Sequence, residues 1–161
     1  MLVVADTSPF IVLSATGDLN VLPRLFNKLI VPPEVIAELG GPNRTTEIRA
    51  FAAAPPAWIV VRSASRVTAI PSLDPGETAA ICLATELHAD AILIDEKRGR
   101  RIARARGLRP LGTVGVLELA AVEGLLDLGQ AFERLRRTTF WVTAEFLEDR
   151  LRVFKDRDGN R

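Results

Sequence analysis

The feature that most constrains the fold is a short apolar run that occurs twice and ends both times in aspartate. Residues 2–5 are Leu-Val-Val-Ala and precede Asp6, and residues 91–94 are Ala-Ile-Leu-Ile and precede Asp95. Such uninterrupted runs are typical of strands that are buried on both faces, as in a parallel sheet. Because the carboxyl ends of parallel strands meet at one edge of the sheet, we expect Asp6 and Asp95 to lie close together there.

Further predicted strands alternate with helices along the chain. Short apolar runs predict strands over 29–31, 58–61 and 108–111. Helical spacing, prolines and glycines predict helices over 9–15, 18–29, 33–39, 45–54, 74–88, 97–106, 113–123, 127–137 and 143–154. This alternation is typical of an α/β fold. We therefore predict a three-layer α/β/α sandwich with a central, mostly parallel sheet of about five strands.

The size and composition of the chain predict one globular domain. The chain has 161 residues, of which 48% are hydrophobic and 25% charged, values typical of soluble proteins with a genuine core. We expect this domain to span residues 1–154 and a polar C-terminal tail to occupy 155–161. No apolar run is long enough to span a bilayer, and the N-terminus does not resemble a signal peptide. These features predict a cytoplasmic protein without a membrane partner.

The scarcity of cysteine and histidine limits the possible chemistry. With one cysteine, Cys82, and one histidine, His88, the chain cannot form an intramolecular disulfide or a Cys/His zinc cluster. No serine lies in a nucleophile elbow, and no Gly-x-Gly-x-x-Gly motif follows a strand. A metal would therefore need carboxylate ligands, which favour hard ions such as Mg²⁺ or Mn²⁺.

Asp6 and Asp95 each have a structural explanation beside a functional one. Ser8 can cap a helix with Pro9 as its first residue, which leaves Asp6 in the turn as a ligand-binding or a loop-capping group. Asp95 can be the N-cap of the helix that follows it. Two carboxylates on neighbouring strands repel each other unless a cation lies between them. That repulsion favours a functional pair.

Two glutamates are further candidates. Glu38 lies near the C-terminal end of a short helix, where an anion is unfavourable, and this misplacement hints at a use. Glu77 follows Asp74 at the spacing of a capping box, so it can either close that box or project toward the acidic edge. Four acids at one edge could bind one or two Mg²⁺ or Mn²⁺ ions, a type of site that hydrolyses phosphodiesters.

Cations are concentrated in one stretch of the chain. Residues 97–109 contain seven of them and no acid, although the net charge of the chain is only +1. Such a run is either a solvated helix face or a surface that binds a polyanion. The members that we expect to bind such a ligand are Lys97, Arg98, Arg100 and Arg101.

Four segments together resemble the PIN-domain family, the metal-dependent ribonuclease fold that includes VapC-type toxins. These are residues 3–9, residues 31–39, residues 73–80 and residues 92–100. The resemblance implies that Asp6, Glu38, Glu77 and Asp95 are the metal ligands and the catalytic acids. The chain departs from the family at two places. Many members have aspartate where Glu77 stands, and a Thr-x-Asp pattern where this chain has Ile94-Asp95-Glu96, so that Glu96 is an alternative to Asp95.

The resemblance implies a Mg²⁺- or Mn²⁺-dependent endoribonuclease that acts as the toxin of a toxin–antitoxin pair. Its partners would be RNA, an antitoxin protein and a second copy of the chain in a homodimer. Thr7, Ser8, Lys97, Arg98, Arg100 and Arg101 would contact the RNA. The alternatives are a catalytically weak or inactive PIN-like protein-interaction module and a nuclease that acts on structured DNA.

Overall fold

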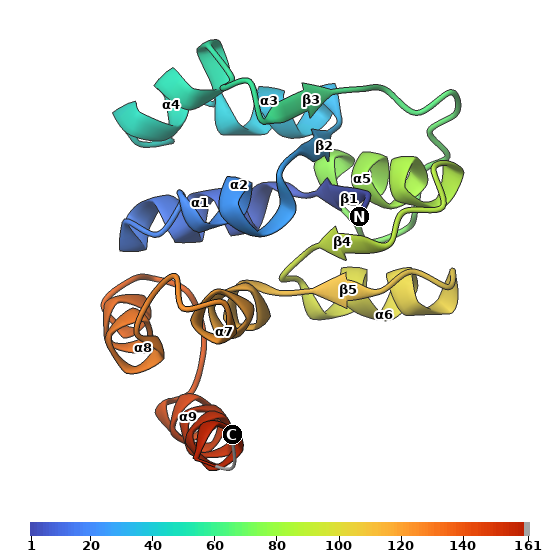
Figure 1. Cartoon of the computed structure of the whole chain (residues 1–161). Helices are drawn as coiled ribbons and strands as arrows, with labels where there is room; N and C mark the ends of the chain where they lie inside the picture. The colour runs from blue at the N-terminus through green and yellow to red at the C-terminus, as the bar shows by residue number, and fades with distance from the viewer. Residues whose placement is uncertain (160–161) are drawn as a thin grey trace.

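The computed structural model describes residues 1–159, and their centre is a five-stranded sheet in the order β3-β2-β1-β4-β5 (Figure 1). The strands are β1 (Val3–Ala5), β2 (Leu29–Val31), β3 (Ile59–Val61), β4 (Ala91–Leu93) and β5 (Pro110–Leu111). Every neighbouring pair is parallel. The α/β fold with a parallel sheet is therefore confirmed. β1 is the central strand and β4 its direct neighbour, so Asp6 and Asp95 follow adjacent strands.

Helices cover both faces of the sheet. They are α1 (Thr7–Thr16), α2 (Val21–Phe26), α3 (Pro33–Leu39), α4 (Thr46–Ala53), α5 (Pro75–Glu86), α6 (Lys97–Ala105), α7 (Thr113–Val122), α8 (Leu128–Arg136) and α9 (Ala144–Asp158). Side chains alternate across a strand. Val3 and Ala5 accordingly pack into one apolar cluster with α1, α2, α7 and α8, whereas Val4 packs into a second cluster with α5 and α6. The chain thus forms the predicted α/β/α layers.

The first helix begins earlier than the sequence suggested. Thr7 is its first residue and Asp6 its N-cap, so the prediction of Ser8 as N-cap and Pro9 as first helical residue is wrong. Proline fits anywhere in the first turn, because the N–H groups there have no partner within the helix. An N-cap side chain normally accepts from the second or third helical N–H. Pro9, the third residue, has no N–H, and the Asp6 side chain makes no capping bond.

The last helix continues beyond its predicted end. α9 extends to Asp158, so the expected boundary between residues 154 and 155 falls inside it. Leu147 is buried against the core, and Arg150 forms an ion pair with Glu118 of α7 at 2.5 Å. Residues 160–161 of the predicted tail lie outside the described residues. Within residues 1–159, no helix is long and apolar enough to cross a membrane.

Candidate metal centre

Asp6 is a buried acid with an unpartnered oxygen. Its side chain is 2% exposed, and its main-chain N–H donates to the Leu93 carbonyl at 2.9 Å, which ties the end of β1 to the end of β4. Its Oδ1 atom is fully buried and has no hydrogen-bond partner in the structure. A buried polar atom without a partner destabilises the folded state by about 1–3 kcal/mol, and more when it is charged. This oxygen therefore needs a ligand or a proton.

The surroundings of Asp6 favour the proton in the absence of a cation. Burial raises the pKa of Asp6 to about 8, against the stabilising N–H of Thr7. The neighbouring carboxylates of Glu77, Asp74 and Glu38 raise it further by repulsion. A divalent cation would reverse this effect, because it stabilises every carboxylate around it.

Glu38 is held in place by hydrogen bonds from two other elements. The Thr7 hydroxyl donates to its Oε2 at 2.6 Å, and the Gly76 N–H donates to its Oε1 at 3.0 Å. These bonds offset the unfavourable position of an anion near the C-terminal end of α3. Only glycine at 76 leaves the Glu38 carboxylate in this position, because a Cβ there would lie 2.6 Å from Glu38 Oε1. This contact could not be predicted from a local pattern, because it joins residues 38 positions apart.

Asp74 and Glu77 form the capping box at the start of α5 that their spacing predicted. Asp74 Oδ1 accepts from the Glu77 N–H at 2.8 Å, and Glu77 Oε2 accepts from the Asp74 N–H at 3.1 Å. Burial, as the largest cause, raises the pKa of Glu77. Each cap bond uses one carboxylate oxygen and leaves the other free for a ligand. Capping and metal binding are therefore compatible at both residues.

The structure brings Asp6, Glu38 and Asp74 together. One carboxylate oxygen from each lies within 4.8 Å of the other two. In an octahedral Mg²⁺ shell with bonds of about 2.1 Å, adjacent oxygens are about 3.0 Å apart and opposite oxygens about 4.2 Å, so the three oxygens would approach one another on binding one ion. Three neighbouring carboxylates, one of which has a buried oxygen without a partner, fit a hard divalent cation. Asp74 was missed as a ligand candidate, because its capping spacing already explained it.

Asp95 is positioned by the start of α7. Its Oδ1 accepts from the Thr113 N–H at 2.6 Å and its Oδ2 from the Thr113 hydroxyl at 2.7 Å. Burial raises the pKa of Asp95, whereas the Thr113 bonds and Arg100 oppose the rise. Asp95 does not cap the helix that follows it. Glu96 is the N-cap of α6 and accepts from the Arg98 N–H at 3.1 Å.

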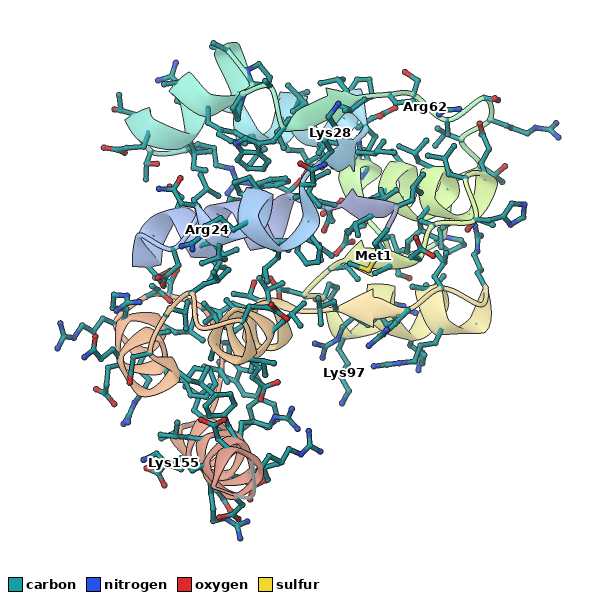
Figure 2. All side chains as sticks on the ribbon, in the orientation of Figure 1. Met1, Arg24, Lys28, Arg62, Lys97 and Lys155 are labelled. Carbon is teal, nitrogen blue, oxygen red and sulfur yellow. The ribbon has the colours of Figure 1, made fainter. Side chains whose placement is uncertain are left out.

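All these acids line one cavity of about 1050 Å³. Of the predicted RNA-contacting residues, the lining includes Thr7, Ser8, Lys97 and Arg100. The Thr7 hydroxyl already donates a hydrogen bond to Glu38. The Lys97 side chain extends outward from α6 (Figure 2).

Arg98 and Arg101 are not among the described residues that line the cavity. Position 98 is turned about 100° around α6 from position 97, which explains its absence from the lining. Arg101 lies one turn after Lys97 and is exposed, but it does not line the cavity. Three further cations of the lining, Arg44, Arg104 and Arg150, were not among the predicted RNA-contacting residues.

Comparison with known proteins gives two findings. A family model described as "DUF3368: PIN domain" matches residues 2–156. The fold is similar to that of a PilT N-terminus domain protein from the hyperthermophilic archaeon Sulfolobus solfataricus P2. That likeness has a TM-score of 0.51 at 17% sequence identity and covers 76% of this chain and 92% of that chain. None of the curated proteins matches the chain.

Asp6→Asn should remove a pH-dependent loss of stability from the metal-free protein. The Asp6 pKa of about 8 exceeds its ordinary value of 3.8, so between these values the folded state holds a proton that the unfolded chain releases. Stability that is present below pH 4 is therefore lost as the pH rises toward 8, by up to about 1.4 kcal/mol per unit. In urea unfolding with EDTA, the free energy of unfolding of the variant should rise relative to that of the parent as the pH increases across this window. A stability difference independent of pH would contradict the assignment.

Gly76→Ala should lower the affinity for a metal ion while it changes the stability of the fold little. The new methyl group would displace the Glu38 carboxylate, which is the flexible end of a side chain, so we expect the free energy of unfolding to change by less than about 1 kcal/mol. Mn²⁺ affinity, measured by calorimetry, should fall by at least about tenfold, as for other groups that orient a ligand. Gly40→Ala is the matched control, since its Cβ would meet no atom closer than 3.5 Å. Equal affinities in both variants would disprove the positioning role of Gly76.

Proposed function

The chain belongs to the DUF3368 family of PIN domains, and from this premise we propose that it is a Mg²⁺- or Mn²⁺-dependent endoribonuclease. The observation that carries the proposal is the orphaned Asp6 Oδ1 beside the carboxylates of Glu38 and Asp74. This arrangement is unfavourable without a cation and favourable with one. A hard divalent ion among carboxylates supports hydrolysis of phosphodiesters.

The residues of this chain would have three roles: to hold the ion, to orient its ligands and to bind the substrate. Asp6, Glu38 and Asp74 would hold the ion, which supplies stabilisation of phosphate charge and activation of water. Thr7 and Gly76 keep Glu38 oriented before any ligand arrives, so little reorganisation remains at the moment of reaction.

Glu77 and Asp95 would act at the margin of this centre. Glu77 has one oxygen outside the capping box, and that oxygen is available to accept a hydrogen bond from the attacking water. Asp95 lines the same cavity and is fixed by Thr113. A role as a further ligand, as the family resemblance implies, is part of the proposal for both residues.

RNA is the proposed substrate because cations accompany the acids. Lys97, Arg100 and Arg104 lie on the face of α6 that lines the cavity, and Arg44 lines it from the segment after α3. Such cations neutralise phosphates and make the affinity depend on salt. From the family alone, we further propose a toxin role, an antitoxin partner and a homodimer.

Cleavage of labelled RNA tests the proposal. With Mn²⁺, we expect endonucleolytic products that disappear in EDTA and decrease about 100-fold or more in Asp6→Asn and Asp74→Asn, the effect of losing a group that stabilises developing charge. Glu34→Gln is the control, because Glu34 lies one turn before Glu38 on α3 but outside the cavity lining. Products that persist in EDTA and in Asp6→Asn would refute a metal nuclease. If cleavage and stabilisation by Mn²⁺ are both absent, the interaction module is favoured instead.

Arg104→Ala should weaken RNA binding more than Arg101→Ala. Both side chains are exposed on α6, but among the two only Arg104 lines the cavity. Loss of one phosphate contact should lower the slope of log affinity against log salt by about 0.7 for a single strand. Anisotropy titrations in the Asp6→Asn background measure binding without cleavage. Equal slopes for the two variants would show that this face of α6 does not contact RNA.

A further inference from the structure

One side of the cavity has exposed aromatic side chains. Trp141 is 87% exposed and Phe146 is 47% exposed, and both line the same cavity as Asp6 and Glu38. Tryptophan is normally largely buried, because its indole ring is the largest apolar side chain. Trp58 shows this usual behaviour, since it packs against Phe51 with 5.7 Å between the ring centroids.

The backbone around Trp141 is anchored on both sides. Its neighbours Phe140 and Val142 are half-buried and pack against the apolar core. The Phe140 N–H donates to the Thr138 hydroxyl at 3.2 Å. After Trp141, Thr143 caps α9 by accepting from the Phe146 N–H at 3.1 Å. The indole is thus presented outward from a fixed segment, so binding a ligand would order little additional chain.

The cavity combines three kinds of side chain. Acids at the start of α1, on α3 and at the start of α5 form the candidate metal centre. Lys97 and Arg104 of α6 supply positive charge, and residues 140–146 supply aromatic rings. Arg150 of α9 is already paired with Glu118, so it adds little net charge. Cations beside exposed aromatic rings are the usual means of binding single-stranded nucleic acids. A duplex keeps its base faces stacked inside and could not use the rings in this way.

We propose that Trp141 and Phe146 form a stacking platform for unpaired bases of single-stranded RNA in this cavity. The inference rests on the proposed function, because it takes RNA as the ligand of the cavity. It adds a base-binding site formed by the segment before α9 and the first turn of that helix. Stacking tolerates every base, so the platform would favour single strands without reading their sequence.

Tryptophan fluorescence tests the platform without requiring catalysis. In the Asp6→Asn, Trp58→Phe double variant, Trp141 is the remaining tryptophan of the chain's 2. A 12-residue oligouridine should quench its emission in a saturable way. The same strand annealed to its complement should bind more weakly and quench less. Binding of oligouridine without quenching would overturn the proposal.

Affinity variants give a second readout. In the Asp6→Asn background, Trp141→Ala should lower the affinity for labelled oligouridine about tenfold, and Trp141→Phe should retain most of it, because phenylalanine still offers a ring. Val122→Ala is the control for loss of an exposed apolar side chain, since Val122 is 49% exposed but does not line this cavity. The melting temperature of each variant shows whether it is folded.

The outcomes separate the two proposals. RNA cleavage that depends on Mn²⁺, together with equal oligouridine affinity in Trp141→Ala and its parent, would overturn the platform and leave the nuclease intact. The platform would be supported and the nuclease refuted by a different result. In that case oligouridine quenches Trp141 and Trp141→Ala loses affinity tenfold, but the parent protein does not cleave RNA with Mn²⁺. Loss of affinity in Trp141→Ala that Trp141→Phe fails to restore would also contradict stacking.

Discussion

The carboxylate of Asp6 lies at the end of the central strand, almost inaccessible to water, with one oxygen that contacts no donor. Pro9 contributes to this state by removing the N–H that would normally satisfy a helix N-cap. Asp6 therefore occupies the N-cap position of α1 but makes no capping hydrogen bond with its side chain. A folded protein tolerates such a group only if the group is protonated or a cation neutralises it.

The elements around Asp6 bring more negative charge rather than compensation. α3 contributes Glu38 and the start of α5 contributes Asp74 and Glu77, although like charges at short range oppose folding. Each acid is nevertheless fixed by backbone or hydroxyl donors, among them Gly76, whose missing side chain leaves room for Glu38. Local repulsion together with well-placed donors is what a preformed cation site requires.

The sequence was informative where a local rule has one structural solution. Buried apolar runs predicted the parallel sheet and placed Asp6 and Asp95 at one edge, because strand direction alone determines where their ends lie. Glu38 was a candidate because an anion near the C-terminal end of a helix is unfavourable. The spacing of Asp74 and Glu77 correctly predicted a capping box but concealed the second use of Asp74, since a carboxylate has two oxygens and the pattern accounts for one.

Features that depend on distant contacts could not be predicted. The approach of Gly76 to Glu38 joins residues far apart in the sequence. The start of α1 at Thr7 could not be distinguished from a start at Pro9, because proline fits either position. The charge run did not reveal which cations line the cavity until the face of α6 was known. Trp141 gave no signal, because its exposure depends on how Phe140 and Val142 pack.

Asp6, Glu38 and Asp74 form the proposed site for a divalent cation. Anomalous diffraction from crystals of the protein grown with saturating Mn²⁺ tests this assignment. We expect an anomalous peak bonded to one oxygen of each of these three residues, including Asp6 Oδ1. A cavity without a peak at saturating Mn²⁺, or a peak held by Glu77 and Asp95 without Asp6, would contradict it.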